Sequence, residues 1–395
     1  MLRTLVVPAV FIATAILTGC QAIQKNELPL KETTKQQTSQ SESSEPTSES
    51  KIPLAPDAKP AEQPVAAPEP KNIITVKEEV IQIPAHMDGR LVLGLSETAS
   101  LPNLELSIRA KLDTGAENTS ADARNITLFE RDRKKWVKFE LARTSKGSIP
   151  LELPVKETIK IKRPGSPSVN RLVVSMTIAI GDITQPVDIT LTDREQFEFP
   201  LLVGRNFMQD LAVIDVHQND IADMKVIETR TRQIEAPLSS KPYTKRIRQR
   251  VSIEGLKVLG SLENMSIPGI NINLPARIDT GAKTSSLDAR NLKIFTKEKK
   301  NWVRFEIPDT KGQLISIEKP VTRFISIKRH GLANERRPVV AINAQIGDLV
   351  RLTQFSLRSR EGYKYPILVG VRFLENTAVV DVSQEFTTSI AQRDK

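Results

Sequence analysis

Two aspartates, Asp113 and Asp279, occupy the same place in two copies of one motif. Each opens an Asp-Thr-Gly-Ala sequence, and the copies are displaced by 166 residues, from 113 to 279. Two carboxyl groups within hydrogen-bond distance cannot both ionise, so such a pair shares one proton and titrates as a unit. Its ionised member can polarise a water while its protonated member donates to a second oxygen. The repeat therefore predicts acid–base chemistry by one carboxyl group from each half of the chain.

A short strand is predicted before each of these turns. Apolar side chains alternate with other residues there, namely Ile108, Ala110 and Leu112 in the first copy and Leu274, Ala276 and Ile278 in the second. Such alternation is typical of a half-buried strand, and a carboxylate at the end of a packed strand is held more rigidly than one on a mobile loop. Pro275 predicts that the second of these strands lies at a sheet edge.

The duplication extends well beyond the motif. The same offset relates Gly94 to Gly260, Glu97 to Glu263, Trp136 to Trp302, Arg194 to Arg360, and Asp215 to Asp381. Two copies indicate a tandem duplication rather than a solenoid. We predict a first lobe at 78–218, a basic linker at 219–249, a second lobe at 250–385 and a tail at 386–395.

The fold class predicted for both lobes is all-β. The pattern Val174, Met176, Ile178 returns as Val340, Ile342, Ala344, and turn signals separate many such short segments. Aromatic residues make up 4% of the chain, while Val, Ile and Leu carry the apolar content, which suits β-rich domains. At 395 residues the chain is long enough for two cores. We expect two β-barrel lobes in tandem.

The N-terminus is predicted to be an export signal and a tether. Residues 1–20 end in Leu17-Thr18-Gly19-Cys20, with the chain's one cysteine, and resemble a bacterial lipoprotein signal peptide with its lipobox. The resemblance implies that Cys20 is acylated and anchors the protein in the cell envelope. Gln21 favours the outer membrane, on its periplasmic face, in a Gram-negative cell. Residues 21–77, rich in Ser, Thr and Pro, are expected to be disordered.

No metal, cofactor or nucleic acid is expected. The three histidines, at 86, 217 and 330, are far apart, and no Gly-x-x-x-x-Gly-Lys loop is present. The formal charge of +10 permits anionic partners, but the positive residues are widely spread. The basic linker at 219–249 has no run of interleaved aromatic residues, so nucleic-acid binding has little support. We expect a solvated linker, and contact with an anionic surface is the alternative.

A second repeated motif identifies a family. Each copy carries, 91 residues after its aspartate, an apolar run that closes in glycine, Leu201-Leu202-Val203-Gly204 and Ile367-Leu368-Val369-Gly370. Asp-Thr-Gly followed by such a run resembles the retropepsin-like aspartic peptidases. More narrowly, segments such as Lys111–Ala116 and Trp136–Phe139 look like a bacterial family described as ATP-dependent zinc proteases, whose members resemble retropepsins.

The resemblance assigns roles to both turns. It implies that Asp113 and Asp279 are catalytic and that Thr114 and Thr280 hold the turns together by crossed hydrogen bonds. Gly115 and Gly281 would permit close backbone approach, and Gly204 and Gly370 would end a strand beside the site. Ala116 and Ala282 cannot donate a side-chain hydrogen bond to the carboxylates, which predicts a weakly acidic to neutral working range. One chain would supply both halves, so a monomer could form the dyad.

The predicted function is a membrane-anchored aspartic endopeptidase that acts on peptides or proteins. The alternative is a non-catalytic lipoprotein that uses the same fold to bind peptides or envelope components. Glu117 adds negative charge beside the first turn, and Asp122 and Asp288 stand where the family pattern has histidine. Turns over the cleft are predicted either at 131–134 with 297–300 or at 146–147 with 311–312.

Overall fold

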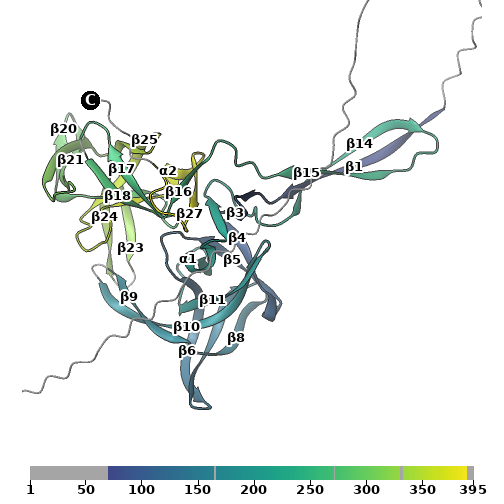
Figure 1. Cartoon of the computed structure of the whole chain (residues 1–395), viewed down its shortest axis with the longest axis horizontal. Helices are drawn as coiled ribbons and strands as arrows, with labels where there is room; N and C mark the ends of the chain where they lie inside the picture. The colour runs from purple at the N-terminus through teal and green to yellow at the C-terminus, as the bar shows by residue number, and fades with distance from the viewer. Residues whose placement is uncertain (1–69, 164–165, 271, 330–331, 389–395) are drawn as a thin grey trace, which may run out of the picture. The chain divides into compact units, whose positions relative to one another are not determined.

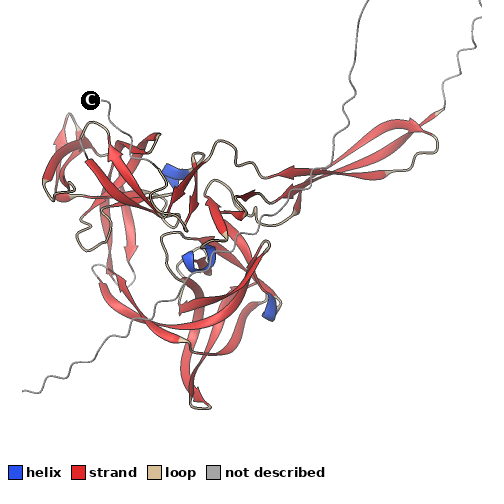
Figure 2. Cartoon of the chain, viewed as in Figure 1, coloured by secondary structure: helices blue, strands red, loops and turns tan. Residues whose placement is uncertain are grey.

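The computed structural model describes residues 70–163, 166–270, 272–329 and 332–388 (Figure 1). All described residues belong to one compact unit, Pro68–Lys395. Strands dominate it, and its helices are very short (Figure 2). None of the helices in these ranges is long and apolar enough to cross a membrane. The predicted signal peptide, Cys20 and most of the tether lie outside the described residues.

Lobe 1 is a curled sheet that closes on itself. Its order is β11-β10-β4-β5-β12-β6-β7-β8, with β9 on β10, and the further pairing of β11 with β6 joins distant parts of this order. The elements are β3 (Arg90–Gly94), β4 (Ser96–Leu101), η1 (Pro102–Leu104), β5 (Leu106–Leu112), β6 (Thr119–Arg131), β7 (Lys134–Thr144), β8 (Gly147–Pro154), β9 (Glu157–Arg163), β10 (Ser166–Ile180), β11 (Ile183–Thr192), β12 (Leu201–Val203), α1 (Arg205–Met208) and β13 (Ala212–Asp215).

Lobe 2 repeats this plan. Its main sheet has the order β17-β18-β26-β19-β25-β24-β23, closed by pairing of β17 with β24, and β20-β21-β22 form a separate sheet. The elements are β16 (Lys257–Gly260), β17 (Leu262–Ile267), β18 (Ile272–Ile278), β19 (Ser285–Asp288), β20 (Arg290–Lys297), β21 (Lys300–Pro308), β22 (Leu314–Pro320), β23 (Arg323–Arg329), β24 (Leu332–Ile346), β25 (Leu349–Arg358), β26 (Ile367–Val369), α2 (Val371–Leu374) and β27 (Ala378–Asp381). The prediction of two tandem all-β lobes is confirmed.

The prediction of an edge strand at Pro275 is wrong. Strand β18 lies between β17 and β26 in the sheet. Pro275 is opposite Asn264 of β17, while the parallel ladder with β26 begins one residue later, at Ala276. The N–H that proline lacks is therefore not needed on the β26 side.

The two lobes share a five-stranded sheet. Its order is β16-β27-β13-β3-β2, with β2 at His86–Met87. Strand β13 of lobe 1 pairs antiparallel with β27 of lobe 2, and Ile214 lies opposite Val380. Both strands are buried along their whole length. Backbone hydrogen bonds and buried apolar side chains therefore join the lobes.

A separate three-stranded sheet comes mostly from segments that were expected to be a tether and a linker. Strands β1 (Lys71–Ile83), β14 (Lys225–Pro237) and β15 (Tyr243–Arg250) form it in the order β14-β1-β15 (Figure 1). Strand β1 includes residues 71–77 of the predicted tether, β14 lies in the predicted linker, and β15 lies there except for Arg250. The side chains of β15 are all exposed, in keeping with a solvated segment. These segments become strands because β1 supplies backbone partners to both others.

Candidate active site

Each aspartate directly follows a central strand of its lobe. Asp113 comes after β5 and Asp279 after β18. A short strand that precedes Gly204 or Gly370 runs parallel to each of them, β12 beside β5 and β26 beside β18. The backbone N–H of Asp113 donates to Val203 O at 2.9 Å, and that of Asp279 donates to Val369 O at 2.9 Å. Neighbouring strands therefore fix the position of both aspartates.

The structure contains the crossed hydrogen bonds between the turns. The backbone N–H of Thr114 donates to Thr280 Oγ1 at 3.0 Å, and that of Thr280 donates to Thr114 Oγ1 at 3.1 Å. Each hydroxyl then donates to a carbonyl on the opposite strand, Ile278 O at 3.0 Å and Leu112 O at 2.7 Å. Both threonines are completely buried, so this network joins the lobes directly beneath the aspartates.

The motif glycines show that the two carboxyl groups share one site. A Cβ atom at Gly115 would lie 2.4 Å from Cγ of Asp279, and one at Gly281 would lie 2.3 Å from Oδ2 of Asp113. Each glycine thus packs against the carboxyl group of the opposite lobe, at a distance that no side chain could tolerate.

Backbone donors hold the carboxyl groups from below. The N–H groups of Gly115 and Ala116 donate to Oδ1 of Asp113 at 2.9 and 3.1 Å, and that of Ala282 donates to Oδ1 of Asp279 at 3.1 Å. Both alanines therefore contribute through the backbone.

Gly204 and Gly370 hold the loops that follow the aspartates. A Cβ atom at Gly204 would lie 2.6 Å from the carbonyl carbon of Asn118, and one at Gly370 would lie 2.6 Å from Ala282 O. The next residue after each glycine donates its backbone N–H to the alanine of the motif, at 2.9 Å from Arg205 and 2.8 Å from Val371. The two glycines act through packing.

Two basic residues flank the dyad, and sequence reasoning gave them no role. Lys111 and Arg277 occupy equivalent places, two residues before each aspartate. Arg277 Nη2 lies 2.8 Å from Oδ2 of Asp279, whereas Lys111 Nζ donates across the lobes to Gly281 O at 2.8 Å. A basic residue at the same strand position in both copies was the signal that could have found them.

The electrostatics of the site raise the pKa of Asp113 from its ordinary 3.8 to about 6. Desolvation by the surrounding protein is the largest cause, and repulsion from Asp279 is the second. Lys111, the Gly115 N–H and Arg277 oppose the increase. A pKa near 6 lets Asp113 keep its proton in weakly acidic solution.

Asp122 and Asp288, equivalent residues of the two lobes, each accept a backbone hydrogen bond. Asp122 Oδ1 accepts the backbone N–H of Arg194 at 2.9 Å, and Asp288 Oδ1 accepts that of Arg360 at 2.6 Å. Both carboxylates are buried, and they close the turns after β11 and β25. Burial lowers the pKa of both arginines to about 10.

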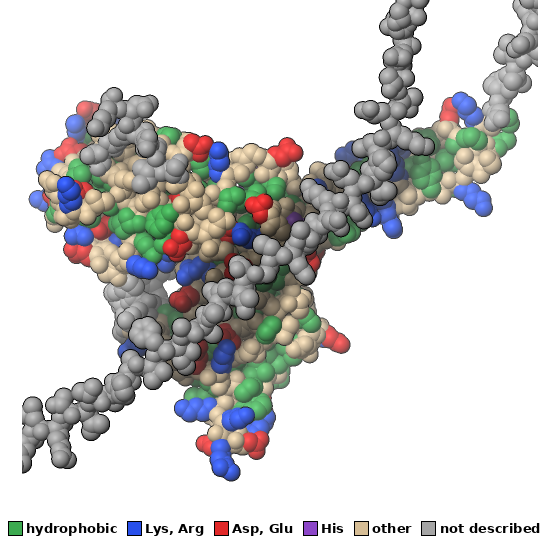
Figure 3. Space-filling view, viewed as in Figure 1, with side chains coloured by type: hydrophobic (Ala, Val, Ile, Leu, Met, Phe, Trp, Pro, Cys, Tyr) green, Lys and Arg blue, Asp and Glu red, His purple; other side chains and the backbone are tan. Residues whose placement is uncertain are grey.

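A cavity of about 310 Å³ lies beside Asp279 and is lined mostly by charged and tyrosine side chains. Its basic residues are Arg205, Arg277, Arg360 and Lys364, and its acidic residues are Glu117 and Glu385. Arg277 connects this cavity to the dyad through its contact with Asp279. Acidic and basic side chains are visible together in the hollow between the lobes (Figure 3).

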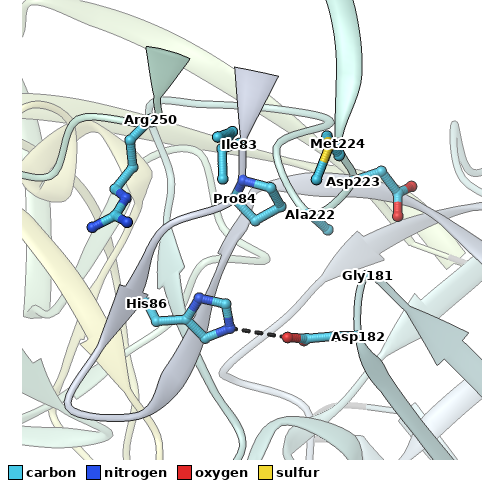
Figure 4. A pocket seen from close by; sticks show the side chains of 9 residues that line it. All are labelled: Ile83, Pro84, His86, Gly181, Asp182, Ala222, Asp223, Met224 and Arg250. Atoms are coloured by element: carbon cyan, nitrogen blue, oxygen red, sulfur yellow. Dashed lines mark hydrogen bonds and ion pairs between the residues drawn. The ribbon is translucent and has the colours of Figure 1, made fainter. Parts of the chain in front are cut away.

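A separate pocket of about 440 Å³ lies away from these residues (Figure 4). In it His86 Nε2 lies 3.0 Å from Asp182 Oδ2, and both side chains are largely exposed. Within the described ranges, no group of three or more His, Cys, Asp or Glu residues is placed to hold a metal ion. The turns predicted to cover the cleft are hairpin turns, β6–β7 and β7–β8 in lobe 1 and β20–β21 and β21–β22 in lobe 2.

Paired Asp-Thr-Gly turns on two tandem β-lobes, joined by crossed threonine bonds, define the retropepsin-like class. The chain belongs to the RimB-like family, whose model is described as retropepsin-like aspartic endopeptidase RimB and matches residues 92–225 and 258–390. The resemblance recognised in the sequence is confirmed.

Curated relatives match over about one lobe's length. A probable alpha-L-glutamate ligase of Parasynechococcus marenigrum is 32% identical over 133 residues, which is 33% of this chain and 28% of the relative. A protein of the same name from Shewanella pealeana is 31% identical over 132 residues, 32% of this chain and 29% of the relative. The crystal structure of Lpg0085, a Legionella pneumophila protein of unknown function, aligns with a TM-score of 0.29 and 33% identity, over 33% of this chain and 98% of that one.

Proposed function

We propose that the protein is an aspartic endopeptidase that hydrolyses peptide bonds with a water activated by Asp113 and Asp279. The observation that carries the proposal is the reciprocal packing of Gly115 on Asp279 and of Gly281 on Asp113. Those contacts bring one carboxyl group from each lobe into a single site. The crossed threonine bonds hold that site from below.

The two carboxyl groups have complementary tasks in this reaction. The ionised carboxylate accepts a proton from the water as the water oxygen attacks the carbonyl carbon of the peptide. The protonated carboxyl group donates its proton to the carbonyl oxygen, which gives a tetrahedral diol. The carboxyl group that took the proton of the water then donates it to the peptide nitrogen as the C–N bond breaks, and the other carboxylate takes a proton from a diol hydroxyl. The products are a carboxylic acid and an amine, and one water is consumed.

We infer that the substrates are acidic peptides, so these should be tested first. The basic side chains of the cavity beside Asp279 favour a carboxylate near the scissile bond. The relatives whose names refer to glutamate ligation carry a region similar to one lobe, although the match spans only 28% and 29% of their lengths. The test substrates should be a mixed peptide library supplemented with peptides that contain consecutive glutamates.

Comparison of three variants tests the catalytic proposal. Wild-type protein should cleave at least one peptide, and Asp113→Asn and Asp279→Asn should each reduce kcat by at least about a hundredfold, because either change removes one acid–base partner. Asp88→Asn is the matched control, since Asp88 is exposed in the turn between β2 and β3 at φ 50° and lies outside both predicted cover turns. Cleavage that persists in both dyad variants, or no cleavage by any protein, would defeat the proposal.

A non-catalytic peptide-binding lipoprotein is the second candidate function. The ion pair between Arg277 and Asp279 favours it, because it engages one carboxylate of the dyad. This function requires that the wild-type protein bind acidic peptides without cleaving them. Isothermal titration with the same library, followed by mass spectrometry of the recovered peptides, separates the two functions.

We propose that acylated Cys20 anchors the protein to a membrane of the cell envelope, with the outer membrane favoured. The sequence Leu17-Thr18-Gly19-Cys20 supports the proposal. The expected partners are therefore a peptide or protein substrate and the membrane, and no nucleic acid. Metabolic labelling with palmitate should mark the wild-type protein and not Cys20→Ser, and unlabelled wild-type protein would contradict the anchor.

A further inference from the structure

The dyad is asymmetric in its contacts with basic side chains. Arg277 and Lys111 hold equivalent positions in the two lobes, but their terminal groups take different partners. Arg277 bonds to the aspartate of its own lobe, at 2.8 Å from Oδ2 of Asp279. Lys111 instead donates to the carbonyl oxygen of Gly281. The duplicated chain therefore presents two different electrostatic environments to its two carboxyl groups.

Other charged groups face the dyad, and their hydrogen bonds go elsewhere. Arg194 donates to Ser120 Oγ at 2.8 Å, Arg360 donates to Tyr365 O at 3.0 Å, and Arg205 donates to Thr114 O at 2.9 Å. Glu117, just after the first turn, is exposed. Over the part of the chain that the structure describes, Arg277 is thus the cation whose nitrogen pairs with a carboxyl group of the dyad.

We propose that Arg277 determines which aspartate carries the shared proton, so that Asp279 stays ionised as the base and Asp113 is the acid. This assignment rests on the proposed peptidase function and names the role of each carboxyl group within it. An arginine in direct contact favours the ionised form of its partner. The proton is then left to Asp113, whose pKa desolvation and the Asp279 charge already raise. Arg277 is a positioning residue, because it acts through Asp279.

A titration without substrate tests this assignment. Aspartate labelled with ¹³C at the carboxyl carbon allows difference spectra between variants of the full chain. In Asp113→Asn, the remaining Asp279 should titrate at a lower pH than the remaining Asp113 does in Asp279→Asn. Adding Arg277→Gln to Asp113→Asn should raise the proton affinity of Asp279 at least tenfold, within the range known for an arginine beside a carboxylate.

A conservative substitution of Arg277, and the equivalent substitution in lobe 1, separate the charge effect of Arg277 from a general loss of structure. Arg277→Lys keeps the charge and should retain most of the effect of Arg277 on Asp279, and it also serves if Arg277→Gln does not fold. Lys111→Gln, the equivalent change in lobe 1, should alter the Asp279 titration less than Arg277→Gln does. Equal titration of Asp113 and Asp279 in the single variants, or equal effects of Arg277→Gln and Lys111→Gln, would overturn the assignment.

The pH dependence of kcat/KM gives the matching kinetic result. Arg277→Gln should move the acidic limb, which reports protonation of Asp279, upward by more than the alkaline limb. Lys111→Gln should move mainly the alkaline limb. If no peptide is cleaved but the titrations differ as stated, the peptidase function fails and the charge asymmetry stands. If cleavage occurs and the titrations coincide, only the proton assignment fails.

Discussion

At the scale of single residues, the geometry of the site depends on the space that the two motif glycines leave for the carboxyl groups. Gly115 and Gly281 give the opposite carboxyl groups room to meet, and no larger residue could occupy either place. Asp113 is half-buried beside a second carboxyl group, and Asp279 is buried. The resulting proton affinity is a property of the assembled site, and it can be measured through folding stability as well as through catalysis.

The raised pKa of Asp113 predicts a specific dependence of stability on pH. Because the folded-state pKa of about 6 lies above the ordinary 3.8, the folded state binds more protons between these pH values. The free energy of unfolding should therefore fall as pH rises from 4 to 6, by at most about 3 kcal/mol at about 1.36 kcal/mol per pH unit. In Asp113→Asn this component should be absent. Urea unfolding of both proteins at several pH values measures the difference, and parallel curves would contradict the prediction.

Gly115→Ala should abolish activity through contact with Asp279. The added Cβ would lie 2.4 Å from the carboxyl carbon, so the carboxyl group has to move away from its partner. Gly89→Ala is the control, because Gly89 has open space around its Cβ position and a φ of 79°. That control should lose about 1–2 kcal/mol of stability and keep its activity. Peptidase assays and thermal unfolding of both variants compare the two effects, and an active Gly115→Ala would contradict the prediction.

At the scale of elements, the site depends on how turns and strands of both lobes interlock. Strands β12 and β26 fix the backbone of the two aspartates, and the threonine network joins the turns. Asp122 and Asp288 also fix turns. Each accepts a backbone hydrogen bond that closes the turn containing a buried arginine. Each carboxylate thus stabilises the turn that it closes.

Removal of the threonine hydroxyls should weaken the junction in a coupled way. Thr114→Val leaves the backbone N–H of Thr280 and Ile278 O without their buried partner, so it should cost about 1–3 kcal/mol. Thr280→Val should cost a similar amount. The double variant should cost less than the sum, because both changes break one network. Chemical unfolding of the three variants measures the coupling energy, and strict additivity would show that the two hydroxyls act independently.

At the scale of the whole molecule, the shared five-stranded sheet makes the lobes dependent on each other. Strands β13 and β27 are buried between their own lobe and the other one. Asp381 is fully buried there and pairs with Arg90 of the opposite lobe. We expect residues 70–388 to unfold in a single calorimetric transition, because separation of the lobes would expose this sheet. Two resolved transitions would contradict that expectation.

Arg90→Ala tests the connection between the lobes. Loss of Arg90 removes a charged partner from buried Asp381, so the free energy of unfolding should fall by about 1.5–3 kcal/mol. Lys71→Ala is the control, because Lys71 pairs with Glu235 at an exposed position and should contribute under about 1 kcal/mol. Calorimetry of the two variants measures both effects. An Arg90→Ala protein as stable as the control would show that the sheet, rather than this ion pair, carries the connection.

The sequence by itself was sufficient to predict those features of the protein that occur in both copies of the repeat. The duplicated Asp-Thr-Gly turns, the glycine strands and the alternating apolar pattern are local, and each occurs twice in one register. They were therefore sufficient to predict two all-β lobes and a pairing of Asp113 with Asp279. The same reasoning assigned Thr114 and Thr280 to the junction through family resemblance, and the hydrogen bonds between them are present.

Only the tertiary structure decided which partners the remaining residues take. Pro275 lies in an internal strand because its neighbour in the sheet, β26, begins pairing one residue later. Strand β1 depends on partners more than a hundred residues away, which no local pattern could indicate. Arg277 and Lys111 are equivalent in sequence, yet one bonds an aspartate and the other a carbonyl across the lobes. Contacts between distant segments distinguish them, so the dyad's asymmetry is a property of the folded chain.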